Sequence, residues 1–327
     1  ARRANVSAST VSRVLRGTTS VSDEKKTAVL QAVASLDYHP NIFAQSLASG
    51  QSMTIGVLTH NFGSPFYDGI LQGVLQGLEE TDYWPIFADG RWQEAEEVRA
   101  LEMLLERRVD GLILVGGQLP EERLQEIARR KPLIVVARQL KTLPDHCIYV
   151  DNYQAGYAVT RFLLELGHRT VAHITAQMHY TLTIDDVQQR YLGYRQALQD
   201  AGLEPDPQLL VKGDLQQQSG VLALETLLAR ERPFSAVFAA NDQMAFGARM
   251  ALYRRGIRVP EDVSIVGFDD EPSAAYMVPP LTTVRQPSLQ MGSKAAEAVL
   301  ALVGGESLNL PIFQGELVVR ESAVRQR

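Results

Sequence analysis

The stretch 54–59, TIGVLT, is the first of a series of short apolar runs, and the regular spacing of that series decides the fold. Helical segments separate the runs; within 94–107 the apolar side chains of Val98, Leu101 and Leu104 recur at helical spacing. Buried strands joined by helices in this way predict a parallel sheet of the α/β class. Up to the middle of the chain the apolar runs lie at 54–59, 85–88, 111–115, 133–137 and 148–150.

The same alternation begins again in the second half of the chain. The restart predicts two similar α/β halves with open parallel sheets. Because ligands of such sheets bind beyond the carboxyl ends of the strands, two facing halves predict a cleft between them. The apolar runs of the second half lie at 171–175, 209–211, 236–240 and 264–268.

The first 50 residues show no strand pattern and predict short helices. Ser7 is a residue type that caps helix starts, and Val11, Val14 and Leu15 are spaced to share one helical face. A second helix is expected to begin at 22–25, where acidic residues suit the positive end of a helix.

Charge is unevenly distributed along the 327 residues. The first 50 residues contain six Lys and Arg residues against three Asp and Glu residues, whereas the rest contains 26 against 35, and the net charge is −6. A cationic end on an anionic body favours a polyanionic partner for that end, although a solvated helical face has the same composition. The 45% of hydrophobic residues and the length predict an ordinary globular protein with two domains.

No run of 18 apolar residues is present, so we expect no membrane partner. Residues 1–5 contain neither an apolar signal segment nor an initiator Met, which indicates a chain that begins inside a longer one. Cys147 is the single cysteine and cannot form an internal disulfide, which fits a reducing compartment. We therefore expect a cytoplasmic protein.

The sequence lacks the motifs that are typical of enzymes. It contains no G-x-S-x-G elbow, no G-x-x-x-x-G-K-[ST] phosphate loop and no G-x-G-x-x-G after a strand. His168, His173 and His179 do not have the spacing of a zinc motif, and we interpret them as surface or strand-edge residues. We predict no catalytic residue, no metal and no cofactor. Carboxylates paired by the fold, such as Asp269 with Asp270, stay an open alternative.

Polar and aromatic side chains follow several predicted strands or lie in the helix 188–201. Aromatic rings stack on the apolar face of a sugar, while Arg, Asn and Asp bond its hydroxyls, so this set suits a small polyol or sugar. The candidate ligand-binding residues are Phe66, Tyr67, Arg138, Arg190, Asn241 and Asp269.

Some of these candidates also have a purely structural interpretation. Phe66 suits a core position at a helix start, and Asn241 suits a helix cap. Arg190 and Asp269 are harder to explain as structure, although a loop ion pair would account for them. Because Asp269 and Asp270 are adjacent and point in different directions, we expect one to face the cleft and the other to bond the loop.

Longer motifs occur in a fixed order along the chain. The stretch 6–15, VSASTVSRVL, is followed by YHPN at 38–41, NDQMAFG at 241–247, VPEDVSIVGFDD at 259–270 and LTTV at 281–284. In this order and spacing they resemble the lactose/galactose-repressor family of bacterial transcription regulators. The resemblance covers essentially the whole chain, and the combination of motifs is far more specific than a lone helix-turn-helix match.

The resemblance implies a helix-turn-helix headpiece at 1–40 with its first helix largely missing, and a hinge helix and linker at 41–52. It also implies a cytoplasmic homodimer that binds double-stranded operator DNA and responds to a small effector, a sugar or sugar derivative. No leucine heptad follows the core, which favours a dimer over a tetramer. The core would resemble periplasmic sugar-binding proteins, with two doubly wound parallel sheets in lobes formed by 53–150 with 284–315 and by 151–283 with 316–327.

The same resemblance implies which headpiece residues contact DNA. The recognition helix would start at Ser7. Ala8 and Ser9 match the positions that choose bases, and Arg13 matches an arginine suited to a guanine edge. Arg16 stands where the family commonly has Asn and would add a phosphate contact. Phosphate contacts are also expected from Ser7, Thr10, Ser12 and Ser22.

In the hinge, the segment 42–48 is too short for a stable free helix, so we expect it to order on DNA. Asn41, Ala44 and Gln45 match minor-groove residues, and Leu47 matches a leucine that wedges between the central base pairs. Many members have Arg where Gln45 stands, which weakens the electrostatics of the hinge and keeps the wedge.

In the core, the resemblance implies effector contacts for Phe66 and Tyr67 in the first strand–helix loop and for Arg190, Asn241 and Asp269. Some members stack an aromatic residue in the loop that holds Leu215 here, which favours a sugar over a flat purine as ligand.

We therefore predict a sequence-specific DNA-binding transcriptional regulator, a repressor, under the control of a sugar-like effector. Two other classes stay open. A transport-type sugar-binding protein of the same core fold would lack the headpiece and hinge motifs, and a sugar-converting enzyme would need catalytic motifs.

Overall fold

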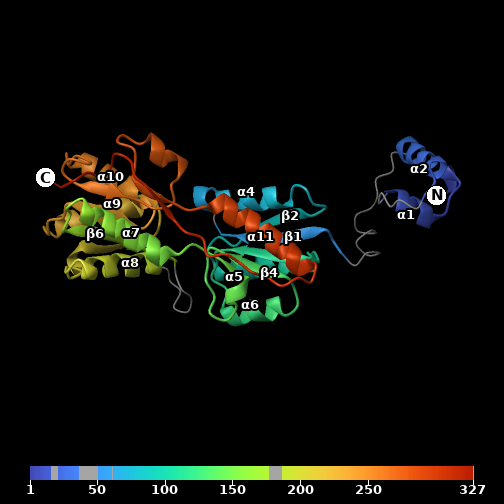
Figure 1. The fold of residues 1–327 in the computed structure, drawn as a ribbon, viewed down its shortest axis with the longest axis horizontal. Helices are drawn as coiled ribbons and strands as arrows, with labels where there is room; N and C mark the ends of the chain where they lie inside the picture. The colour runs from blue at the N-terminus through green and yellow to red at the C-terminus, as the bar shows by residue number, and fades with distance from the viewer. Residues whose placement is uncertain (16–20, 37–50, 61, 177–185, 327) are drawn as a thin grey trace. The chain divides into compact units, whose positions relative to one another are not determined.

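The computed structural model describes residues 1–15, 21–36, 51–60, 62–176 and 186–326. It divides into two compact units, Ala1–Ser52 and Met53–Arg327 (Figure 1).

The N-terminal unit is helical, as predicted. It contains the 3-10 helix η1 (Arg2–Ala4) and the α-helices α1 (Ala8–Leu15) and α2 (Asp23–Ser35). Each helix gives one apolar residue to a small common core, which consists of Ala4, Val14 and Val29. The apolar face that Val14 shares with Val11 thus holds α1 against α2.

The second unit begins with a five-stranded parallel sheet in the order β2-β1-β3-β4-β5. The central strands are buried on both faces because helices cover them, which is why β3 consists of the apolar residues GLILV. The bounds are β1 Thr54–Thr59, β2 Trp84–Asp89, β3 Gly111–Val115, β4 Leu133–Val136 and β5 Cys147–Ile148.

The helices of this first lobe begin where local chemistry favours a helix start. Pro65 occupies the first turn of its helix, where the missing N–H costs nothing, and three acidic residues lie in the first turn of α5. Short connections join these helices to the strands (Figure 1). The bounds are α4 Pro65–Leu78, α5 Glu94–Glu106, α6 Glu121–Ala128 and the 3-10 helix η2 Pro144–His146.

The second lobe holds a four-stranded parallel sheet in the order β7-β6-β8-β9. Helix α7 packs against α8, and α9 packs against α10. The strands are β6 Val171–Ala176, β7 Leu210–Gly213, β8 Ala236–Ala239 and β9 Ser264–Val266. The helices are α7 Asn152–Glu165, α8 Asp186–Asp200, η3 Pro207–Leu209, α9 Gln217–Ala229, α10 Asp242–Arg254 and η4 Pro272–Tyr276.

The chain passes between the lobes in segments that are hydrogen-bonded to one another. β10 (Thr283–Arg285) pairs antiparallel with β11 (Glu316–Val318). The amide of Asp151 donates to the carbonyl oxygen of Phe313 at 2.9 Å, and the amide of Phe313 donates to the carbonyl oxygen of Tyr149 at 3.0 Å. The crossing segments therefore form hydrogen-bonded ribbons rather than separate threads.

Between two of these crossings the chain returns to the first lobe as α11 (Ser288–Val303), which packs closely on α4. The approach is possible because Gly292 has no side chain: a Cβ atom there would lie 1.9 Å from the carbonyl oxygen of Ile70. After β11 the chain enters the second lobe, where the amide of Ile265 donates to the carbonyl oxygen of Ser322 at 2.8 Å.

Our interpretation of the histidines was wrong for two of the three. His168 and His173 are buried, with 3% and 0% of their surface exposed. β6 lies inside the sheet between β7 and β8, so His173 stacks on Tyr194 and its Nδ1 lies 2.8 Å from the carbonyl oxygen of Phe238. Burial lowers the pKa of His173 to about 4. His179 lies outside the described residues.

No helix in the described part of the chain is both long and apolar enough to span a bilayer. The described residues likewise contain no group of three His, Cys, Asp or Glu side chains arranged to hold a metal ion.

Candidate functional site

The N-terminal unit exposes the start of α1, where the sequence predicts base contacts. Ala8, Ser9 and Arg13 are exposed, whereas Val14 on the opposite face is buried. A short helix that presents small, hydroxyl and guanidinium side chains outward is suited to entering a major groove.

Ser7 precedes α1 and caps it. Its Oγ accepts a hydrogen bond from the amide of Thr10 at 3.1 Å, and it lies 2.8 Å from Ser9 Oγ and 2.9 Å from Thr10 Oγ1. The predicted helix start is therefore correct to one residue, with Ser7 as the cap and Ala8 as the first helical residue. Hydroxyls and free amides at a helix N-terminus are favourable partners for a phosphate.

The remaining DNA-facing predictions divide between described and undescribed residues. Ser12 is part of α1, and Ser22 is the exposed N-cap residue of α2. Arg16, Asn41, Ala44, Gln45 and Leu47 lie outside the described residues.

In the first lobe, Phe66 and Tyr67 occupy the first turn of α4, beside the carboxyl end of β1. The two rings meet edge to face with centroids 5.3 Å apart. Phe66 also packs against the core of the lobe, so its structural interpretation is part of its role. Tyr67 meets a third ring, that of Trp92, at 5.9 Å.

A buried histidine–glutamate pair lies behind these rings. His60 Nε2 is 2.7 Å from Glu97 Oε1, and the two side chains are 1% and 0% exposed. Glu97 also accepts hydrogen bonds from the amides of Gln118 and Leu119, and His60 Nδ1 lies 2.9 Å from the carbonyl oxygen of Val115. The carboxyl ends of β1 and β3 and the helix after β2 are thus joined by side chains.

In the second lobe, Arg190 of α8 is buried, with 5% of its surface exposed. Its Nε donates to Asn152 Oδ1 at 2.8 Å, and Nη1 donates to the carbonyl oxygen of Ala240 at 2.6 Å. The guanidinium lies 3.7 Å from the centroid of the Phe268 ring. It is therefore held at the carboxyl ends of β8 and β9.

Asp269 lies next to this arginine, with its Oδ1 4.0 Å from Arg190 Nη1. Oδ1 also accepts a 2.6 Å hydrogen bond from Gln286 Nε2. Burial raises the pKa of Asp269 to about 6, while the positive charge of Arg190 and the bond from Gln286 act in the opposite direction. At neutral pH the carboxylate is mostly ionised and is a strong acceptor for hydroxyl groups.

The neighbouring Asp270 has the separate role that we predicted for one member of the pair. It forms ion pairs with Arg285 at 2.8 Å and with Arg320 at 2.6 Å, which tie the loop to the crossing strand and the last segment. A paired-carboxylate arrangement of Asp269 with Asp270 is thereby disfavoured.

Asn241 is the N-cap residue of α10: its Oδ1 accepts from the amide of Met244 at 3.0 Å. Its Nδ2 donates to the carbonyl oxygen of Leu215 at 2.9 Å. The structural interpretation of this residue is therefore correct, and an effector contact would be an additional role.

Arg138 follows β4 in the first lobe and lies near Glu97, whose charge acts on its pKa. It is buried with 6% of its surface exposed, and its Nη2 donates to the carbonyl oxygen of Leu119 at 2.7 Å. Burial lowers its pKa. These contacts give Arg138 a structural role within the first lobe.

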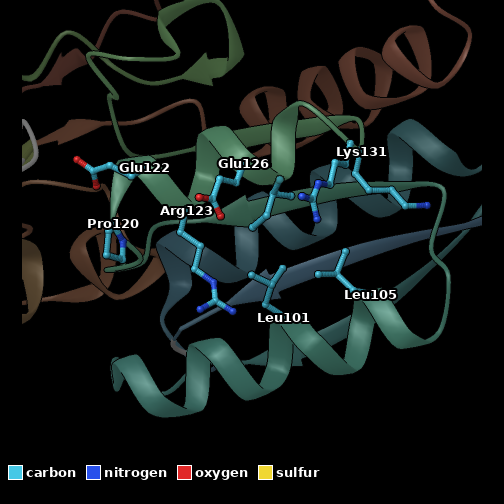
Figure 2. Close-up of a pocket in the computed structure, with 9 residues that line it drawn as sticks. Leu101, Leu105, Pro120, Glu122, Arg123, Glu126 and Lys131 are labelled. Atoms are coloured by element: carbon cyan, nitrogen blue, oxygen red, sulfur yellow. The ribbon is translucent and has the colours of Figure 1, made fainter.

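A surface pocket on the first lobe lies elsewhere, between α5 and α6 (Figure 2). Its apolar floor includes Leu101 and Leu105, and its rim mixes acidic and basic side chains such as Glu126 and Arg123. The predicted effector residues do not line it. They lie at the strand ends and helix starts described above.

Comparison with known proteins agrees with this architecture. Residues 1–41 match a model described as bacterial regulatory proteins, lacI family, and residues 160–323 match a periplasmic binding protein-like domain. The HTH-type transcriptional regulators AscG and GalR of Escherichia coli K12 are each 33% identical, over 99% and 98% of this chain and 97% and 94% of theirs.

Solved structures match over almost the full length. A lac repressor dimer bound to operator and an anti-inducer is 26% identical, with a TM-score of 0.88 over 99% of this chain and 97% of that chain. A regulator CelR–cellobiose complex is 33% identical, with a TM-score of 0.76 over 98% and 97%.

Fold, surface and comparisons together define a DNA-binding regulator in which a helix-turn-helix unit precedes a two-lobed, periplasmic-binding-protein-like core. The chain belongs to the LacI family of bacterial regulatory proteins.

Sequence reasoning missed His60, Glu97 and Trp92, which none of the motifs contain. One signal was available, because His60 directly follows a predicted strand and Trp92 lies shortly after another. Asp269 was selected because it follows a predicted strand, and the same reason applies to His60 and Trp92.

Proposed function

We propose that the chain is a repressor that binds a pseudo-palindromic operator as a homodimer and is controlled by a sugar bound between its core lobes. The observation that carries the effector half is the buried Arg190–Asp269 pair at the carboxyl edge of the second sheet, because a guanidinium and a carboxylate held in place there match the hydroxyls of a sugar. The relatives named for GalR and the CelR–cellobiose complex support a sugar.

The DNA half of the proposal assigns base contacts to Ala8, Ser9 and Arg13 and phosphate contacts to Ser7, Thr10, Ser12, Arg16 and Ser22. Asn41, Ala44, Gln45 and Leu47 would act in the minor groove. The exposed Ser7 and Ser9 at the start of α1 and the exposed Arg13 in its last turn support it, as does the lac repressor dimer bound to operator.

The effector half of the proposal assigns effector contacts to Phe66, Tyr67, Arg190, Asn241 and Asp269. It divides the lobes at the boundaries expected from the sequence. The protein would act in the cytoplasm without catalysing a reaction.

The DNA half is tested by titrating the upstream promoter and a random duplex at equal salt. The promoter should bind more tightly, with log K falling as log salt rises. Arg13→Ala should cost about 1–3 kcal/mol at its own base pair, while Lys25→Ala, on α2, should weaken both duplexes equally. Equal affinity for promoter and random DNA would contradict the regulator function and favour the alternative, a solute-binding protein.

The effector half is tested by a thermal-shift screen of sugars and sugar phosphates, followed by operator titration with the sugar that stabilises the protein. The sugar should change operator affinity by about 1–3 kcal/mol in coupling free energy. In Asp269→Ala this change should disappear. A variant that binds the sugar normally and still responds would show that the effector site is elsewhere.

A further inference from the structure

A corner of two aromatic rings lies at the carboxyl edge of the first sheet. Trp92 follows β2 and is partly exposed, and Tyr67 lies in the first turn of α4. Their ring centroids are 5.9 Å apart and the ring planes meet at 73°. A flat ligand that stacks on one of these rings would therefore meet the edge of the other.

The backbone that carries Trp92 is held in a conformation that its residue types rarely adopt. Arg91 and Trp92 have φ values of 51° and 54°, in the left-handed region. The amide of Arg91 donates to Asp89 Oδ1 at 2.8 Å, and Gln118 Nε2 donates to the carbonyl oxygen of Trp92 at 2.8 Å. Such strain persists where the surroundings fix it, and it concentrates at ligand sites.

The buried His60–Glu97 pair packs against the indole ring of Trp92. The His60 ring lies 5.1 Å from that of Trp92. Glu97 fixes His60 on one side and the amide of Gln118 on the other, at 2.7 and 2.8 Å. Gly117 leaves the room for this, because a Cβ atom there would lie 2.7 Å from His60 Cε1. The same network thus holds both the ring and the backbone of Trp92.

We propose that Trp92 and Tyr67 form a stacking subsite that receives the apolar C–H face of a sugar ring, with His60 and Glu97 as positioning residues for Trp92. A buried polar pair that fixes an aromatic ring at a strand end is not needed for core packing alone, because apolar residues would fill that space without the cost of desolvating polar groups. The inference rests on the proposed effector function, and it adds the residues that select a ring-shaped ligand.

The first experiment uses tryptophan fluorescence, because the chain has two tryptophans, Trp84 and Trp92. Trp84 is 75% exposed on the edge strand β2, so Trp84→Phe leaves Trp92 as the single reporter. The probes are aldopentoses, aldohexoses and their β-linked disaccharides, cellobiose included. A sugar that raises the Tm of the wild-type protein should shift or quench the Trp92 emission.

The second experiment measures affinity for that sugar by calorimetry. Trp92→Ala should weaken binding roughly tenfold, and Trp92→Phe should retain most of the affinity, because a smaller ring still stacks. Trp84→Phe is the matched control and should bind as the wild type does. The subsite would be overturned, while the effector function stands, if Trp92→Ala bound the sugar with normal affinity and the sugar left the Trp92 emission of Trp84→Phe unchanged.

The positioning role is tested with Glu97→Gln in the Trp84→Phe background. The substitution keeps acceptor capacity toward the amide of Gln118 and removes the charge opposite His60. It should change the emission of Trp92 before any sugar is added and weaken sugar binding several-fold. An unchanged spectrum with unchanged affinity would remove His60 and Glu97 from the proposal. A panel in which no sugar stabilises the wild-type protein would overturn both the subsite and the sugar part of the proposed function.

Discussion

The two lobes present different chemistry at the same place in the same kind of sheet. At the strand ends of the first lobe, the rings of Tyr67 and Trp92 are partly exposed, and the polar pair His60–Glu97 is buried next to Trp92. At the strand ends of the second lobe, Arg190 and Asp269 lie 4.0 Å apart. Under the proposed function, the parallel sheet decides where the ligand contacts lie, and the residues near each strand end decide their kind: stacking in one lobe, directed polar bonds in the other.

The strongest test of this comparison is to remove the positive charge of Arg190 from the second lobe. Arg190→Met should lower the free energy of unfolding at pH 7.5 by about 3 kcal/mol, because Asp269 then stays buried without its cation. The response to effector should also disappear. Urea unfolding and operator titration measure the two effects.

Arg195→Met is the matched control for this substitution. Arg195 lies on the same helix, and its guanidinium lies 5.8 Å from the centroid of the Tyr191 ring. It should cost less than about 1 kcal/mol. Equal losses in the two variants would contradict a special role for the Arg190–Asp269 pair.

The next test uses pH. The pKa of Asp269 is raised to about 6 in the folded state, so the charged carboxylate costs stability above that pH and the cost is lost as pH falls through about 6. Asp269→Asn, which cannot ionise, should therefore gain up to about 3 kcal/mol relative to the wild type at pH 7.5 and almost nothing at pH 4. Differential scanning calorimetry across this range measures the difference.

The exposed Asp262 is the control, because its pKa is shifted in the opposite direction to that of Asp269. The hydrogen bond from Arg258 lowers the pKa of Asp262 to about 2, so this carboxylate stabilises the folded state at neutral pH. Asp262→Asn should be less stable than the wild type at pH 7, and the difference should vanish as pH falls toward 2. The same pH trend in both variants would contradict the burial of Asp269.

The smallest expected effect is in the first lobe. Tyr67→Ala should weaken sugar binding by about 0.5–1.5 kcal/mol, the range typical of an aromatic contact, without changing the pH dependence. Tyr67→Phe keeps the ring and should retain most of the affinity. If Tyr67→Ala instead abolished the response to effector, as we expect for Arg190→Met, the division between a stacking lobe and a polar lobe would be wrong.

Most of the fold could be predicted from the sequence because its two periodicities are strong. The apolar runs at 54–59 and 111–115 coincide with β1 and β3 to the residue. The predicted strand 133–137 is one residue longer than β4, because Ala137 has a φ of 55° and leaves the strand. Local composition does not fix such an end, since the tertiary contacts of the loop decide it.

The strand end at 264–268 marked Asp269 in the sequence, and Arg190 was singled out within the helix 188–201; the structure brings these two side chains to within 4.0 Å of each other. For Arg138 the structure adds something that spacing cannot show, namely that its side chain donates a hydrogen bond to the carbonyl oxygen of Leu119. The buried state of His173 was missed for a related reason: strand order, which places β6 between two neighbours, is a tertiary property.

The hydrogen-bonded crossings between the lobes have a mechanical consequence. The β10–β11 pair and the bonds of Phe313 to residues 149 and 151 link segments that would otherwise bend one by one. A narrow ribbon of this kind flexes easily about an axis in its own plane, whereas sliding one strand along the other breaks every bond of the ladder at once. We therefore expect the joint to bend more readily than it shears, which would restrict a ligand-driven movement of the lobes to one rotation.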